Sequence, residues 1–186
     1  SPYKLDPNNA NRMFAGYDNV WRNDAVRTGN TWTQISNFGG TSNMTDIAVA
    51  PSNSDVVYVS RTDNSFRRSN NATGGAPTWT NLTGNLPINN EPRDIEIDPT
   101  DPTHLFIAIN NDIFESNNSG GSWTNISGTL PNISLNTIVI DKNSSIKSMY
   151  VGMDVGIYYR DNTISLFIWL IPQLKSPNFP QLHQRT

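Results

Sequence analysis

The chain has 186 residues, with 13 Lys and Arg against 16 Asp and Glu, 16% charged residues and no Cys. Without Cys it cannot build a disulfide scaffold or a Cys-ligated zinc or iron–sulfur site, and its slight negative charge disfavours a nucleic-acid module, which normally carries a basic surface. Its 26 Asn residues and few strong helix formers disfavour a helical bundle, and its 5 Trp, 6 Tyr and 7 Phe are too many for a disordered chain.

A unit of about 46 residues occurs four times along the chain. The approximate units are residues 1–36, 45–83, 93–127 and 137–162. Three markers recur in every unit. They are an apolar residue just before the first turn, an aromatic residue in the second strand, and an aromatic residue in the third strand. A fourth marker, a Trp-Thr strand, begins at Trp32, Trp79 and Trp123 and is absent from the last unit. Agreement of independent markers on one period indicates a true repeat.

Each unit reads as four short strands. The first alternates apolar and polar residues, as in 94–98, and stops at a turn rich in Pro, Asn, Asp and Ser. The second is aromatic and β-branched, as in 105–109, and the third is brief, as in 113–116. A polar loop with Gly precedes the fourth, 122–126. Four strands per unit of this length predict an all-β β-propeller of four-stranded antiparallel blades, with the last blade incomplete.

The loop before the fourth strand resembles the Asp-box, Ser-x-Asp-x-Gly-x-x-Trp, of BNR-repeat propellers. The matching residues are Ser116, Asn118, Gly120 and Trp123 in unit three, Ser69, Asn71 and Trp79 in unit two, and Trp32 in unit one. Asn118 and Asn71 stand where the family usually has Asp. The resemblance covers residues 3–162. The chain is similar to sortilin-like and xyloglucanase-like propellers and to secreted bacterial repeat proteins. This resemblance implies the fold and a structural role for the box, but not one function, because such propellers include hydrolases, receptors and assembly factors.

Propeller ligands usually bind at the loops that join strand two to strand three and one blade to the next. The first set of loops carries one acid per unit, which suits a sugar or a cation, although Asp also favours the tight turns that a repeat copies. The densest charged cluster lies at 91–94, and residues of the 61–63 turn could extend it. The candidate binding residues are therefore Asp18, Arg61, Asp63, Glu91, Arg93, Asp112 and Asp154.

These features favour a non-catalytic binding or scaffold module, secreted or on the cell surface, that recognises a glycan or a protein through its loops. The alternative is a fragment of a glycoside hydrolase, xyloglucanase-like or sialidase-like, acting with paired carboxylates. No sialidase-type Arg triad is evident, and the two histidines, His104 and His183, support neither a metal site nor a catalytic triad. We expect no catalytic residues, metal, cofactor or nucleic-acid partner, and leave enzymatic activity open.

The fourth unit loses its pattern after Asn162. Residues 163–186 contain an apolar run, 166–171, and then a segment with Pro and Gln. This run is far shorter than the ~20 residues of a membrane span. A domain boundary, a truncation and a shifted reading frame are the alternatives for this tail.

Ring closure is the remaining question for the fold. We expect a larger ring, completed by further blades or by self-association with partner chains; in the alternative, residues 166–171 supply the missing strand of a closed four-blade ring. The chain begins Ser1-Pro2 without Met, so we expect a processed or excised piece whose precursor carries an export signal.

Overall fold

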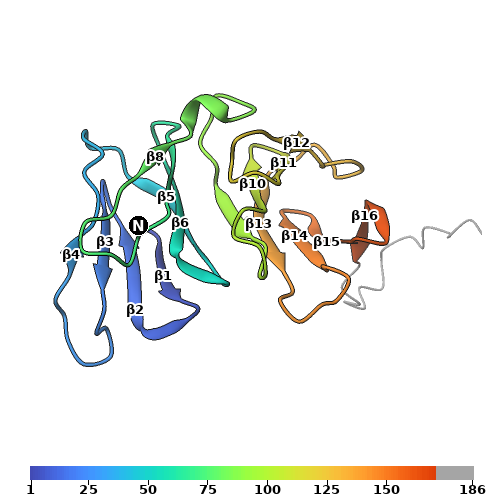
Figure 1. Ribbon diagram of the computed structural model, residues 1–186. Coiled ribbons are helices and arrows are strands. Elements are labelled where there is room, and N and C mark those ends of the chain that lie inside the picture. Colours follow the sequence, from blue (N-terminus) through green and yellow to red (C-terminus); the bar gives the residue numbers. More distant parts are fainter. Residues whose placement is uncertain (171–186) are drawn as a thin grey trace, which may run out of the picture.

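The structure is a computed structural model that describes residues 1–170; the tail residues 171–186 lie outside the described part. The described chain folds into four antiparallel sheets of four strands each, in which neighbouring strands are also consecutive in sequence. Figure 1 shows the sheets side by side in chain order. The predicted all-β propeller architecture is therefore confirmed.

The strands are grouped into four blades in chain order. Blade one contains β1 (Tyr3–Asp6), β2 (Asn9–Gly16), β3 (Val20–Asn23) and β4 (Thr33–Gln34). Blade two contains β5 (Met44–Ala50), β6 (Asn53–Arg61), β7 (Phe66–Ser69) and β8 (Thr80–Asn81), followed by a 3-10 turn, Thr83–Asn85. Blade three contains β9 (Asp94–Ile97), β10 (Leu105–Ile109), β11 (Asp112–Ser116) and β12 (Thr124–Asn125). Blade four contains β13 (Leu135–Ile140), β14 (Met149–Met153), β15 (Gly156–Asp161) and β16 (Ile164–Leu170).

The second strand of a central blade is apolar on both sides because both of its faces are covered. All five residues of β10 are buried. Side chains of a strand alternate between the two faces of its sheet. Leu105 and Ile107 accordingly join the cluster shared with blade two, whereas Phe106 and Ala108 join the cluster shared with blade four. This explains why the sequence shows a continuous apolar run here rather than an alternating one.

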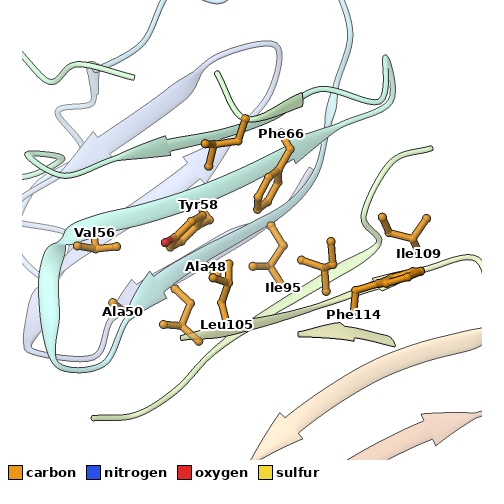
Figure 2. Packing of buried hydrophobic residues seen from close by; sticks show 12 residues of the cluster. Ala48, Ala50, Val56, Tyr58, Phe66, Ile95, Leu105, Ile109 and Phe114 are labelled. Carbon is orange, nitrogen blue, oxygen red and sulfur yellow. The ribbon is translucent and has the colours of Figure 1, made fainter. Parts of the chain in front are cut away.

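Three apolar clusters fill the spaces between successive blades. In the cluster between blades two and three, Tyr58 and Phe66 from one blade meet Ile95, Leu105 and Ile107 from the other (Figure 2). Equivalent clusters join blade one to blade two and blade three to blade four. The core of this molecule is thus a series of interfaces between sheets.

The four described blades form an open arc. The inner strands pack in the order β1, β5, β9 and β13. Blades one and four lie at opposite ends of the row in Figure 1. The closed four-blade ring considered from the sequence is therefore wrong for the described residues. The apolar segment of the tail nevertheless forms β16, which pairs with β15 and extends the fourth blade to Leu170, beyond the expected boundary at residue 162.

The loop before β12 is closed by its own side chains. The Ser116 Oγ accepts a hydrogen bond from the Gly120 N–H (2.9 Å), and the Asn118 Oδ1 accepts one from the Ser122 N–H (2.9 Å). Gly120 has a φ of +80°, and a Cβ added there would lie 3.3 Å from the Phe66 ring. The Trp123 ring packs edge-on against the same Phe66, at 5.9 Å between centroids. We propose a structural role for this loop, which locks the box-like residues against the preceding blade.

The loop before β8 repeats this arrangement. The Asn71 N–H donates to the Ser69 Oγ (3.2 Å), and the Asn71 Oδ1 accepts from the Thr78 N–H (2.8 Å). The Trp79 indole N–H donates to the Ile35 carbonyl of blade one (2.8 Å). Each of the two Trp residues therefore contacts the blade that precedes its own.

We predict that Trp123→Ala lowers the free energy of unfolding by about 3 kcal/mol, at the lower end for a large aromatic because the side chain is only partly buried. The matched control is Trp32→Ala in blade one, where no preceding blade is described; there we expect a loss of less than about 1 kcal/mol. Urea melts of both variants measure the difference. Equal losses would show that packing between blades does not set the contribution of Trp123.

Candidate functional site

Within the predicted charged cluster, Arg61 and Asp63 form an ion pair, and Arg61 also bonds the loop that precedes β5. Arg61 is 2% exposed, and its guanidinium donates to the carbonyls of Ser42 (3.1 Å) and Gly39 (3.0 Å) while pairing with the Asp63 carboxylate (3.2 Å). Burial alone would raise the pKa of Asp63, but hydrogen bonds from Ser65 and the charge of Arg61 lower it. Arg61 and Asp63 thus hold the loop between blades one and two.

Two other predicted acids bond to neighbouring segments of their own blades. The Asp112 Oδ1 accepts hydrogen bonds from the Asn125 amide (3.1 Å) and the Ser127 hydroxyl (2.8 Å). The Asp154 Oδ1 accepts one from the Asn136 amide (2.8 Å). In both cases the carboxylate bonds a neighbouring strand segment of its own blade.

The remaining predicted residues reach solvent without forming a pocket. Arg93 is exposed, and Asp18 and Glu91 are partly exposed. None of the seven predicted residues lines either of the two small cavities described below. The predicted residues therefore lie outside both of these cavities.

A second group of carboxylates, which the sequence did not single out, lies on the inner strands. The Asp46 Oδ2 on β5 accepts a hydrogen bond from the Ile95 N–H of blade three (2.8 Å). Asp94 on β9 accepts from the Ile138 N–H of blade four, and the Glu96 Oε1 accepts from the Ile140 N–H (3.2 Å). Each carboxylate therefore joins its own inner strand to that of the next blade.

Burial changes the acidity of these carboxylates. It raises the pKa of Asp46 to about 6 and that of Glu96 to about 7, because the charged form loses hydration. Burial raises the pKa of Asp94 as well. Glu96 and Lys4 line a cavity of about 150 Å³ between the inner strands of blades one, two and three. A protonated carboxyl near neutral pH could act as a general acid, so this is the strongest catalytic arrangement that we find among residues 1–170.

A charged cluster joins blades three and four. The His104 Nδ1 lies 3.0 Å from the Asp98 carboxylate and its Nε2 lies 2.8 Å from the Glu115 carboxylate, while the Lys147 Nζ of blade four lies 2.7 Å from Asp98. The hydrogen bond to Glu115 raises the pKa of His104. Although burial alone would raise it, hydrogen bonds from Lys147 and Thr100 hold the pKa of Asp98 well below its usual range.

This cluster borders a cavity of about 130 Å³, which also has Arg160 in its wall. Two carboxylates beside one imidazole favour its protonated form, so His104 acts as an electrostatic link between the blades rather than as a free base. Sequence spacing could not reveal this contact, because Asp98 and Lys147 are 49 residues apart and only the fold brings them together.

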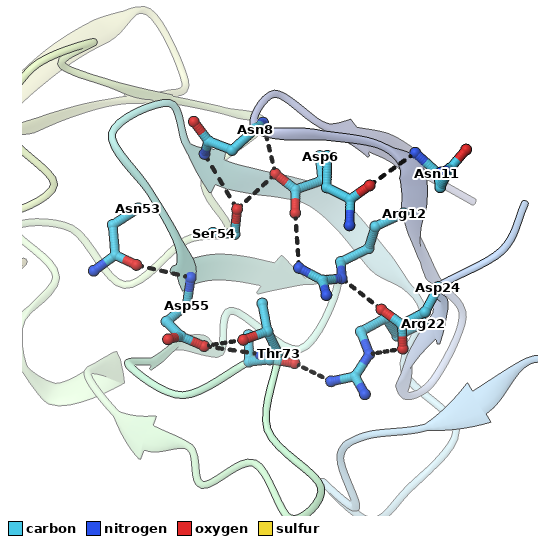
Figure 3. A network of polar contacts seen from close by, with 12 residues as sticks. Asp6, Asn8, Asn11, Arg12, Arg22, Asp24, Asn53, Ser54, Asp55 and Thr73 are labelled. Carbon is cyan, nitrogen blue, oxygen red and sulfur yellow. Dashed lines mark hydrogen bonds and ion pairs between the residues drawn. The ribbon is translucent and has the colours of Figure 1, made fainter.

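A similar polar network joins blades one and two (Figure 3). The buried Asp6 accepts hydrogen bonds from the Asn8 N–H (2.8 Å) and the Ser54 Oγ (2.7 Å) and pairs with Arg12 (3.1 Å), which in turn pairs with Asp24 (2.5 Å). Ser54 belongs to blade two, so this network also crosses a blade boundary. Asp6 and Asp98 occupy equivalent positions of the repeat, and each bonds a residue of the next blade. A buried Asp that crosses the blade boundary is therefore a structural feature of the repeat.

Two kinds of site are not found in the described part of the chain. Among residues 1–170, no three or more His, Asp or Glu side chains are grouped so that they could hold a metal ion. No helix there is long and apolar enough to cross a membrane.

Solved structures share this fold. An ancestral GH74 enzyme superposes with a TM-score of 0.70 over 92% of this chain, at 18% identity. The GH74 xyloglucanase from Xanthomonas campestris gives 0.69 over 92% at 17% identity, and the GH74 enzyme of Niastella koreensis gives 0.65 over 91% at 15% identity. The chain spans only 24%, 30% and 24% of these three proteins. No family model and no curated protein matches the sequence. At such identity the likeness shows the β-propeller fold alone.

We predict that the folded chain loses stability as the pH rises from 5 to 8. Glu96 has a folded pKa raised to about 7, so folding favours its protonated form and this contribution disappears as the pH rises through 7. The raised pKa of His104 acts in the same direction, because the stabilising charge is lost above the folded pKa. Glu96→Gln, which keeps an oxygen acceptor for Ile140, should reduce the decline by roughly 2 kcal/mol in denaturant melts at the two pH values.

The control for this prediction is Glu91→Gln on the loop face, which should leave the pH profile unchanged. A Glu96→Gln variant with the same pH dependence as the original chain would contradict the assigned burial of this carboxylate.

Proposed function

We propose that this chain is a non-catalytic binding module, secreted or displayed at the cell surface, that recognises a glycan or a protein through its propeller loops. The observation that carries the proposal is that three acidic residues of the loop face already accept hydrogen bonds from the protein. Asp63 accepts a hydrogen bond from Ser65 of its own loop, Asp112 accepts one from Ser127 after β12, and Asp154 accepts one from Asn136 on β13. These hydrogen bonds keep the loops in a fixed shape. Carboxylates engaged in this way suit a rigid recognition surface better than an active site.

The same loops offer groups suited to recognition. Tyr17, in the loop between β2 and β3, is 61% exposed and presents an aromatic ring, and Arg93 is an exposed cation before β9. An exposed aromatic ring with polar neighbours can cover the apolar face of a sugar or pack against a peptide. We infer that these two residues contribute to ligand binding, together with Asp18 and Glu91.

The second candidate function is a fragment of a glycoside hydrolase. Its support is the fold likeness to proteins described as GH74 enzymes, one of them a xyloglucanase. Glycoside hydrolysis needs one protonated and one ionised carboxyl group flanking the scissile bond. Glu96 has the acidity for the first role, but its Oε1 already accepts a backbone hydrogen bond from blade four. This engagement, in a cavity of about 150 Å³, is why we rank catalysis second.

The test combines binding with turnover on one preparation of the chain. We predict binding on an array of glycans that includes xyloglucan oligosaccharides and sialosides, or to a protein ligand, without release of reducing sugar. Tyr17→Ala and Arg93→Ala should each weaken binding about tenfold. Lys142→Ala, an exposed change in the turn between β13 and β14 at the opposite end of the strands, should not.

Sugar release that is abolished by Asp63→Asn, Glu91→Gln or Glu96→Gln would overturn the proposal in favour of the hydrolase. Binding that is unaffected by both loop-face changes but lost with Lys142→Ala would place the ligand on the opposite rim and contradict the assigned surface.

A further inference from the structure

One aromatic position distinguishes the end of the arc from its interior. The second strand of each blade carries an aromatic residue that faces the following blade: Phe14, Tyr58, Phe106 and Tyr150. The first three are 0%, 0% and 6% exposed, because the next blade covers them. Tyr150 is 36% exposed. The fourth blade therefore presents the surface that blades one to three bury.

All four strands of the blade contribute apolar side chains to that surface. In the strand register Val139 pairs with Tyr150, Tyr150 with Tyr159, and Tyr159 with Ile168, so these side chains share one face. Ile157 and Leu170 form a second pair on that face. The exposed apolar members of this open face are Val139, Tyr150, Ile157, Ile168 and Leu170. A contiguous exposed apolar face of this kind marks an interaction site.

The repeat identifies the kind of surface that covers such a face. Tyr58 is covered by the first and second strands of blade three, through Ile95, Leu105 and Ile107. The equivalent strands of blade one are β1 and β2, and their corresponding side is uncovered among the described residues. Tyr3 is 73% exposed and Leu5 is 53% exposed there, at the positions that Ile95 and Ile97 occupy in blade three. The chain thus carries both halves of one more interface between blades.

We propose that the open face of blade four binds blade one of a second copy of this chain, head to tail. The inner strands offer a matching polar contact. Asp46 and Asp94 each accept the backbone N–H of the following inner strand, at Ile95 and Ile138. Thr137 occupies the equivalent position in blade four and is exposed, so its hydroxyl can accept the Tyr3 N–H of the second copy.

The geometry of this contact differs from a face-to-face dimer. Its two surfaces are different, so each copy uses one surface and leaves the other for a further contact. Two copies that close on each other bury both pairs of surfaces. A variant that is damaged on only one surface therefore keeps the other intact, which makes the arrangement testable by mixing.

The experiment is sedimentation of the full 186-residue chain over a range of concentrations. We expect a mass of two or more chains at the highest concentration. Tyr150→Arg and Leu5→Arg should each lower the mass to that of one chain, with the circular dichroism of the original. The control Val155→Arg removes an exposed apolar residue at the loop between β14 and β15 and should leave association unchanged.

The decisive arm mixes the two monomeric variants. The intact open face of Leu5→Arg can bind the intact blade one of Tyr150→Arg, so the mixture should form complexes of two chains. A monomeric original chain, association that survives Tyr150→Arg, or a mixture that stays monomeric would each overturn the proposal. A monomeric original chain would mean that the open face is covered within one chain. A monomeric mixture would mean that the open face of blade four does not bind blade one.

Discussion

Burial of each blade by the next is the constraint on which this structure depends. A single four-stranded sheet whose fourth strand is as short as β12, with two residues, has little core of its own. Its apolar side chains leave water only when another blade lies on them, as Tyr58 and Phe66 do against blade three. The fold is therefore quasi-one-dimensional, and each blade depends on its neighbours.

Polar groups at the same interfaces fix how the blades meet. Asp46 and Asp94 satisfy the backbone of the next inner strand, and the cluster around His104 clasps blade three to blade four. Burial of these carboxylates opposes their ionisation, so the contacts that set the geometry also make stability depend on pH. Because these groups must stay bonded to the neighbouring blade, they are poorly placed to take part in catalysis. We therefore assign recognition to the loops.

The sequence predicted the blades because the repeat reports local strand patterns. The aromatic positions at Phe14 and Phe106 and the turns between strands depend on residues close in sequence. The strand β16 lacks the Trp-Thr marker, and its place in the sheet follows from pairing with β15, which a local pattern does not encode. The buried role of Glu96 and the clasp of His104 depend on the neighbouring blade, so spacing alone could not reveal them.

Hydrogen exchange of the backbone amides tests most directly whether neighbouring blades supply the stability. The Tyr150→Arg variant, in which the proposed association is blocked, is the suitable sample. The account predicts that β6 and β10, whose blades are covered on both faces, exchange at least ten times more slowly than β2 and β14 in the end blades. Uniform protection across all four blades would contradict the account, because each blade would then be stable without two neighbours.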